Sequence, residues 1–259
     1  MTFQAFGARK YLAMQSALGI QINFPSASNV ALGALLAFIW SYSCLAFSGY
    51  LKTTKHFPTG YTRKIFHVLI FMSAVIVHAF GGFIAVCVFG SMVSIAVGMA
   101  LVRGPGSPLY EAIAREKDGA YRTYYVVIPY FATLLGGLAS NLVFGPLAVI
   151  GYLVGGLGDA AGEPAGTRWG KHQFRTANND QMLISKTFEG SAAVLASTII
   201  ALVIGVAISP DLHFDSRAAI ALPFIGLVCT LVEAFSPRGW DNVPMQFVPT
   251  VLAAVLLTK

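Results

Sequence analysis

The sequence predicts an all-α, polytopic integral membrane protein with seven or eight transmembrane helices. Of its 259 residues, 56% are apolar and only 11% are charged, whereas soluble domains carry roughly 25% charged residues. The mean hydropathy is +0.70. Apolar stretches recur along the whole chain, many close to the roughly 20 residues that a helix needs to cross a bilayer. These observations exclude an ordinary soluble domain.

Eight apolar stretches are candidates for spanning or near-spanning helices, and the short ones are expected to be tilted or broken. No soluble domain, repeat or low-complexity linker separates them, which predicts a single transmembrane domain over residues 29–259. Residues 1–28 are expected to form an extramembrane or interfacial segment. The eight stretches are residues 29–50, 64–80, 82–102, 123–140, 143–158, 188–208, 217–236 and 243–258.

Lys and Arg are unevenly distributed among the connections between these stretches. They gather after the first, third, fifth and seventh stretches, and the other connections hold only Arg217. Because Lys and Arg concentrate on the cytoplasmic side, these four connections are expected inside the cell and both termini outside. The net charge of +6 then reflects topology and anionic lipid headgroups, not a nucleic-acid groove. A bacterial inner membrane suits so compact a chain.

The stretch GDAAGEPAGTRWGKH (residues 158–172) is unusually polar for this chain. Its glycines recur every four residues, at Gly158, Gly162, Gly166 and Gly170. On a helix they would form a stripe without side chains, which either a neighbouring helix or a phosphate can approach closely. Pro164 is expected to kink or break this helix at the membrane edge.

Asp159 and Glu163 lie four residues apart and would share one face of that helix. A carboxylate near a membrane is costly and usually functional. Two adjacent carboxylates need a cation between them, and oxygen ligands suit Mg²⁺. The alternative is that Asp159 only caps the following turn.

The stretch SKTFEGS (residues 185–191) places Lys186 and Thr187 at the start of an apolar helix, with Glu189 in its first turn. Helix N-termini favour anions, so the sequence predicts a phosphate-binding helix start. GTRWGKH is not a Walker A motif, because only three residues separate its glycines and no Ser or Thr follows the Lys. This excludes a P-loop kinase.

Further polar residues lie on the same predicted side. RKIFH (residues 63–67) places Arg63 and His67 on one helix face, so His67 is either a satisfied interior histidine or part of a phosphate or metal site. EAFSPRGWDN (residues 233–242) ends the seventh stretch and supplies Glu233, Asp241 and Asn242. By contrast, a solvated charged face is expected from Tyr110, Glu111 and Arg115.

These motifs together resemble the polyprenol kinase family, which includes dolichol, phytol and farnesol kinases and CTP-dependent diacylglycerol kinase. The resemblance covers roughly residues 60–250 and rests on RKIFH, GDAAGEPAGTRWGKH, KTFEGS and VEAFSPRGWDN in the order of the family. Each motif alone is weak, and their combination is specific. CTP:phosphatidate cytidylyltransferases are more distantly similar, but their SPKKT-type stretch is absent, since LISK precedes Thr187 here.

The resemblance implies transfer of the γ-phosphate of CTP to a membrane lipid alcohol such as phytol, farnesol, a polyprenol or diacylglycerol, with Mg²⁺ as cofactor. Asp159 matches the Gly-Asp acidic residue of the family, and Asp241 with Asn242 its late Asp-Asn pair. Lys186 and Glu189 match its Lys-Ser/Thr-x-Glu-Gly motif. The chain departs from many members by carrying Glu163 before a proline.

For this activity we expect Asp159, Lys186, Glu189 and His67 to be catalytic, with Glu189 or His67 accepting the proton of the alcohol. The expected metal ligands are Asp159, Glu163 and Asp241. The expected nucleotide-binding residues are Gly158, Gly162, Gly166, Gly170, Arg63, Lys64, Arg168, Lys171, Thr187 and Asn242.

Two other functions and the oligomeric state stay open. A cytidylyltransferase would release pyrophosphate from CTP. A transporter would carry charges within its spans and inverted repeats, whereas the charges here lie at the ends of the spans. The expected partners are a nucleotide, a lipid alcohol and the bilayer, with homo-oligomer formation left open.

Overall fold

The computed structural model describes residues 26–176 and 184–258, and 83% of the structure is helical. Five helices in this described part are long and apolar enough to cross a membrane. The prediction of an all-α membrane protein is thus confirmed in outline. The expected N-terminal segment, residues 1–28, lies outside the described residues apart from residues 26–28.

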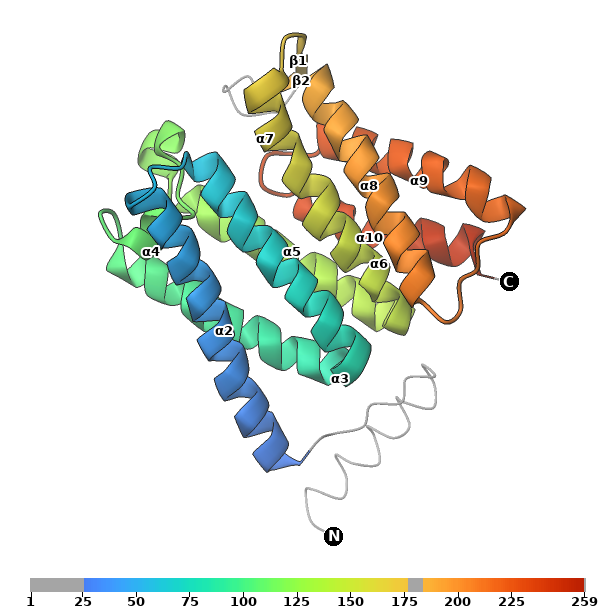
Figure 1. Cartoon of the computed structure of the whole chain (residues 1–259), viewed down its shortest axis with the longest axis horizontal. Helices are drawn as coiled ribbons and strands as arrows, with labels where there is room; N and C mark the ends of the chain where they lie inside the picture. Colours follow the sequence, from blue (N-terminus) through green and yellow to red (C-terminus); the bar gives the residue numbers. More distant parts are fainter. Residues whose placement is uncertain (1–25, 177–183, 259) are drawn as a thin grey trace.

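Every apolar stretch expected to be helical is helical, with ends that differ by a few residues (Figure 1). The described helices are α2 (Ala27–Thr53), α3 (Thr59–Arg103), α4 (Pro108–Glu111), η1 (Glu116–Tyr121), α5 (Tyr124–Phe144), η2 (Gly145–Leu147), α6 (Ala148–Leu153), η3 (Val154–Gly158), α7 (Asp159–Trp169), α8 (Phe188–Ile208), α9 (Ser216–Phe235) and α10 (Asn242–Leu256).

Two long helical segments fold back on themselves. The chain bends sharply inside α3 at Gly82, whose φ of +65° and ψ of −162° suit glycine. This bend separates the two expected stretches 64–80 and 82–102. A second reversal follows α5 at Gly145, where φ is +53°. Each reversal places two apolar helices side by side in antiparallel order.

The segment formed by α6, η3 and α7 lies at the centre of the helices and packs against α3, α8 and α10. All residues of α6 are buried. The expected break at Pro164 is not found, because α7 runs without interruption from Asp159 to Trp169. Pro164 forgoes one backbone hydrogen bond without ending the helix. The irregularity lies earlier, in the π-helical turn η3, directly before Asp159.

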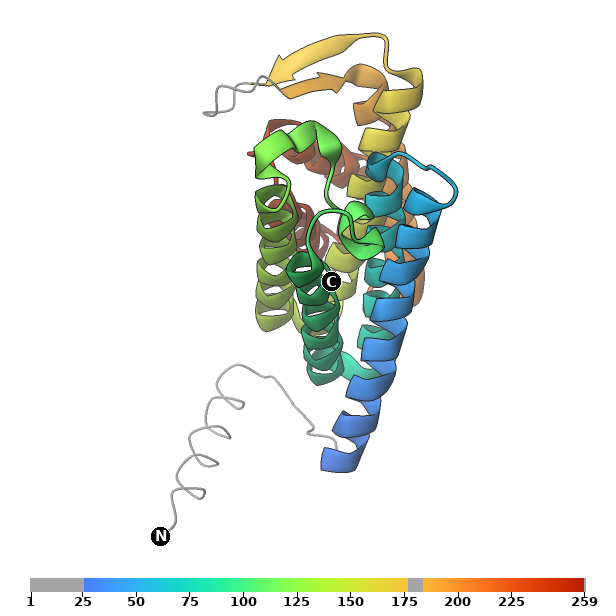
Figure 2. The ribbon, with the colours of Figure 1, turned by 90° about the vertical axis from the view of Figure 1, so that its left-hand side faces the viewer.

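The cation-bearing connections meet at one end of the molecule. Ion pairs join Lys52 to Glu116, Arg115 to Glu163, and Arg238 to Asp118. An antiparallel hairpin of β1 (Gln173–Thr176) and β2 (Ile184–Thr187) projects beyond the helices at the same end (Figure 2). The all-α prediction missed this hairpin, because strands of four residues are too short to display a periodic pattern.

Large apolar side chains face outward along the long helices. Phe80 is 91% exposed and Ile220 is 77% exposed. Soluble monomers rarely expose extensive apolar surface, whereas helices in contact with lipid do so along their whole length. The surface therefore agrees with the composition.

We predict that Gly82→Ala destabilises the bend in α3 by about 1–3 kcal/mol, because its backbone conformation is almost restricted to glycine. Gly98→Ala is the matched control. Gly98 lies in the same helix as Gly82, and a Cβ there would meet no atom within 4 Å. The measurement is the midpoint of thermal unfolding in detergent. Equal midpoints for the two variants would show that the bend does not depend on this backbone conformation.

Candidate functional site

A cavity of about 450 Å³ opens at the end where the cation-bearing connections meet. Charged side chains line one part of it, and apolar side chains of α3 and α5 line the rest. The structure brings together eleven of the residues expected from the sequence. They are Arg63, Lys64, His67, Asp159, Gly162, Glu163, Gly166, Lys186, Thr187, Asp241 and Asn242.

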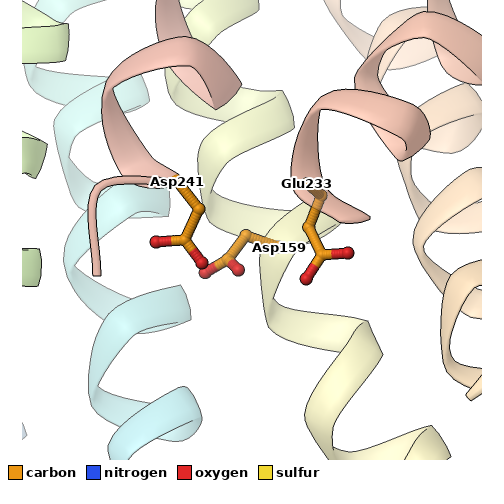
Figure 3. A group of neighbouring side chains, drawn as sticks. All are labelled: Asp159, Glu233 and Asp241. Carbon is orange, nitrogen blue, oxygen red and sulfur yellow. The ribbon is translucent and has the colours of Figure 1, made fainter. Parts of the chain in front are cut away.

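Three carboxylates converge in the charged part of the cavity, and we call Asp159, Glu233 and Asp241 the carboxylate group. One oxygen of each lies within 4.8 Å of the others. Figure 3 shows the Asp159 and Asp241 carboxylates turned towards one another, with Glu233 beside them. An all-oxygen donor set of this kind suits a hard divalent cation such as Mg²⁺.

Different elements position the three members of the carboxylate group. Asp159 begins α7 directly after the π-helical turn, and Glu233 lies in the last turn of α9. Asp241 is the N-cap of α10 and accepts a hydrogen bond from the backbone N–H of Asn242 at 3.2 Å. The turn between α9 and α10 contains Gly239 at φ +86°, which allows the chain to return to the cavity within a few residues.

Within the carboxylate group, no neighbouring cation in the described part of the chain neutralises the negative charge of Asp241. This residue has no ion-pair partner among the described residues. Burial, followed by repulsion from Asp159 and Glu233, raises the pKa of Asp241 to about 6. A raised carboxyl pKa in a cluster of acids marks a position where a cation would be stabilised.

Two lysines contact the other two carboxylates. Lys64 Nζ lies 2.6 Å from Asp159 Oδ2 and 3.0 Å from the Asp159 carbonyl oxygen. Lys186 Nζ lies 2.7 Å from Glu233 Oε1 and also donates to the Glu233 carbonyl oxygen. Both ammonium groups line the cavity, so they are placed to contact an anion bound there.

His67 lies beside Asp159 on the wall formed by α3. Its Nε2 is 2.8 Å from the carbonyl oxygen of Gly155 and 3.5 Å from Asp159 Oδ2. Because a carbonyl oxygen only accepts, Nε2 carries the proton of this hydrogen bond. In the neutral ring, Nδ1 is therefore the atom that can accept a proton.

Glu163 does not belong to the carboxylate group, although it was expected to bind the metal with Asp159. It instead contacts cations from two other elements. Arg63 Nη2 lies 3.2 Å from its carboxylate, and both Arg115 Nη1 and Lys117 Nζ lie 3.0 Å from it. Three positive groups around one carboxylate leave an excess of positive charge on this side of the cavity.

The connection between α3 and α5 contributes to the site instead of forming the expected solvated face. Asp118 is buried and pairs with Arg115 at 3.0 Å and with Arg238. Tyr110 is only 2% exposed, and Glu111 pairs with Arg122. The physical reason is that these charges neutralise one another within this connection and with the turn between α9 and α10, which allows the loop to fold over the cavity.

The glycine stripe mainly packs α7 against α8. A Cβ at Gly158 would lie 2.5 Å from Thr198 Oγ1, and one at Gly162 would lie 2.9 Å from a methyl group of Val194. At Gly166 and Gly170 the nearest side chain is Thr187. Of the two interpretations left open by the sequence, the geometry favours helix packing. Gly162 and Gly166 also line the cavity.

Several expected site residues lie outside the cavity lining, namely Gly158, Gly170, Arg168, Lys171 and Glu189. Glu189 pairs with His172 at 2.7 Å and does not contact Lys186. The guanidinium of Arg168 stacks over the exposed Trp169 ring. Asn242 lines the cavity and donates to the Pro129 carbonyl oxygen and to Thr133 Oγ1, both at 2.9 Å.

The sequence placed Glu233 among the polar residues of this side but not among the expected metal ligands, and it missed Arg115, Lys117 and Arg238 as lining residues. The signal for Glu233 was its position eight residues before Asp241, across a turn that contains Pro and Gly. No pattern in the loop sequence indicated that Arg115 and Lys117 reach Glu163. That contact depends on how the connection folds over α7.

Comparison with protein-family models, with curated proteins and with solved structures gave no match for this chain.

We predict that Lys64→Met lowers the stability of the protein by about 3–5 kcal/mol without divalent ions, because the buried Asp159 carboxylate loses its closest cation. Adding Asp159→Asn should restore most of the loss. The measurement is thermal unfolding of the two single variants and the double variant in detergent with a chelator. Additive losses would show that the pair contributes no coupling energy.

Proposed function

We propose that this chain is an enzyme that transfers the γ-phosphate of CTP to a membrane lipid alcohol, of the kind that the polyprenol kinase family represents. The supporting observation is the carboxylate group, with Lys64 and Lys186 beside it, in a cavity whose remaining wall is apolar. A reaction between a charged phosphate donor and an apolar acceptor requires both kinds of surface in one site.

In this proposal the chain crosses a bacterial inner membrane several times. Folding back of the two longest candidate spans, Thr59–Arg103 and Tyr124–Trp169, gives seven or eight crossings. The end that carries the Lys and Arg residues faces the cytoplasm, so the cavity opens towards the cytoplasmic nucleotide pool. With eight crossings, the last of them made by α10, both termini lie outside.

In this proposal the carboxylate group binds Mg²⁺, with Asp159 and Asp241 as the expected ligands and Glu233 as an additional one. Bound there, the ion would neutralise charge on the phosphates of the nucleotide. Lys64 and Lys186 exchange carboxylate contacts for phosphate contacts when the nucleotide binds. Phosphoryl transfer depends mainly on such positioning and charge neutralisation.

The alcohol of the acceptor attacks the γ-phosphorus, and CDP leaves. We propose His67, which lines the cavity, as the residue that takes up the proton of the hydroxyl through Nδ1, since its Nε2 contacts the Gly155 carbonyl oxygen. Glu189, the other expected base, lies against His172 outside the cavity lining. The geometry therefore favours His67 for this role.

We predict that membranes containing the protein transfer label to lipid from CTP labelled at the γ-phosphate, and not from CTP labelled at the α-phosphate. The assay supplies a mixture of lipid alcohols and phosphatidic acid, and chromatography of the product identifies the acceptor. Label from the α-phosphate alone would identify a cytidylyltransferase. No transfer from CTP, ATP or GTP would contradict both enzymes and leave the transporter.

We predict that Asp159→Asn and Glu233→Gln each lower γ-phosphate transfer by roughly a hundredfold or more, because each removes one charge that holds the metal and phosphates in place. Asp215→Asn is the matched control, since Asp215 lies outside the cavity lining and asparagine preserves its cap of α9 through Oδ1. Initial rates are compared together with thermal midpoints. Wild-type rates in both site variants would rule out the carboxylate group as the catalytic centre.

A further inference from the structure

The cavity contains an apolar arm that the proposed chemistry of the carboxylate group does not use. It lies between the two halves of α3 and the first turns of α5. Every side chain in it is apolar except for the hydroxyl of Tyr130. We define the apolar arm by its lining residues Phe66, Ile70, Val93, Val97, Val126 and Tyr130.

Two contacts hold the Tyr130 hydroxyl in place inside the apolar arm. The hydroxyl of Tyr130 lies 2.9 Å from Ser94 Oγ and 3.3 Å from the carbonyl oxygen of Gly90. These contacts join α5 to the second half of α3. Val126 lies one helical turn before Tyr130, at a rise of about 6 Å. Thr133, almost one turn after Tyr130, lines the same cavity and contacts Asn242. The apolar arm is thus adjacent to the charged part, because Asn242 directly follows Asp241.

The outer faces of α3 and α5 next to the apolar arm are also apolar. Ile95 is 48% exposed and Val127 is 41% exposed, whereas Val97 and Val126 in the arm are only 3% and 7% exposed. These helices therefore line the arm on one side and present apolar side chains to their surroundings on the other, as expected where a protein contacts lipid tails.

The size of the cavity limits what it can enclose. Its volume of about 450 Å³ is at the lower end of the roughly 300–1,000 Å³ of small-ligand sites. It cannot enclose both a nucleoside triphosphate and a long lipid. A lipid acceptor must therefore leave most of its tail in the bilayer and insert only the end that carries the hydroxyl.

We propose that the apolar arm binds the hydroxyl-bearing end of a long-chain alcohol and directs its hydroxyl towards the carboxylate group. The inference rests on the proposed function only for the identity of the reaction. The binding of the alcohol in the apolar arm does not depend on it. Val97 and Val126 contact the first carbons of the alcohol, and the Tyr130 ring packs beside them.

Photolabelling of the wild-type protein tests this proposal without requiring turnover. Vesicles that contain the protein receive a long-chain primary alcohol with a diazirine a few carbons from its hydroxyl, and labelled peptides are identified by mass spectrometry. We expect label on residues 90–97 of α3 and 126–133 of α5. Label confined to other helices would overturn the proposal.

A variant that fills the apolar arm gives a second readout. Val97 is 3% exposed and lines the arm, whereas Ile95 lies on the outer side of the same helix. We expect Val97→Trp to reduce labelling of the α5 peptide roughly tenfold or more, because an indole overfills the pocket. Ile95→Trp is the matched control and should leave this labelling unchanged. Equal labelling in both variants would overturn the proposal.

The same experiments separate this inference from the proposed function. Labelling of the apolar arm that Val97→Trp removes supports the inference even when no phosphate is transferred from CTP. Transfer of phosphate to the alcohol in a protein whose arm is not labelled supports the reaction and overturns the arm as the site of the acceptor. If Val97→Trp does not fold, the labelling map of the wild-type protein alone decides.

Discussion

The ion pair between Lys64 and Asp159 is the constraint on which the site depends. It joins α3 to α7 at 2.6 Å, and both residues are less than 10% exposed. A single charge of either sign would be very costly in this position, whereas the pair compensates much of that cost. The two helices must therefore keep one relative position. The close approach of Gly156 to Phe71 allows them to do so.

The other charges of the cavity follow the same rule. Glu233 pairs with Lys186, Glu163 pairs with three cations, and Asp118 pairs with two. In each case at least one partner comes from another part of the chain. These pairs hold the four cation-bearing connections together at one end of the molecule. Asp241 differs, because no cation pairs with it among the described residues. The place where the site can accept an additional positive charge is thus next to Asp241, and this is where the proposed metal site lies.

The combination of a charged part and an apolar part gives the cavity its chemical character. Charges paired in this way remain inside the protein without exposing ionised groups to lipid, while apolar side chains of α3 and α5 line the rest of the cavity. In the proposed reaction, the phosphate donor comes from water and the acceptor from lipid. The carboxylate group lies where these two approaches meet, and the lysines already contact the carboxylates that the metal would share.

Composition and hydropathy by themselves determined the class of the protein, the positions of its helices and the common side of its cations. The reason is that each stretch must be long enough and apolar enough to form a helix in contact with lipid, whatever the other stretches do. The motifs also identified Lys64, His67, Asp159, Lys186 and Asp241, which line the cavity. Only the tertiary structure decided that Glu233 completes the carboxylate group, that Glu163 lies among cations and that the glycine stripe packs on α8. The reason is physical: these outcomes depend on distances between side chains of different helices, and the spacing within one helix does not specify them.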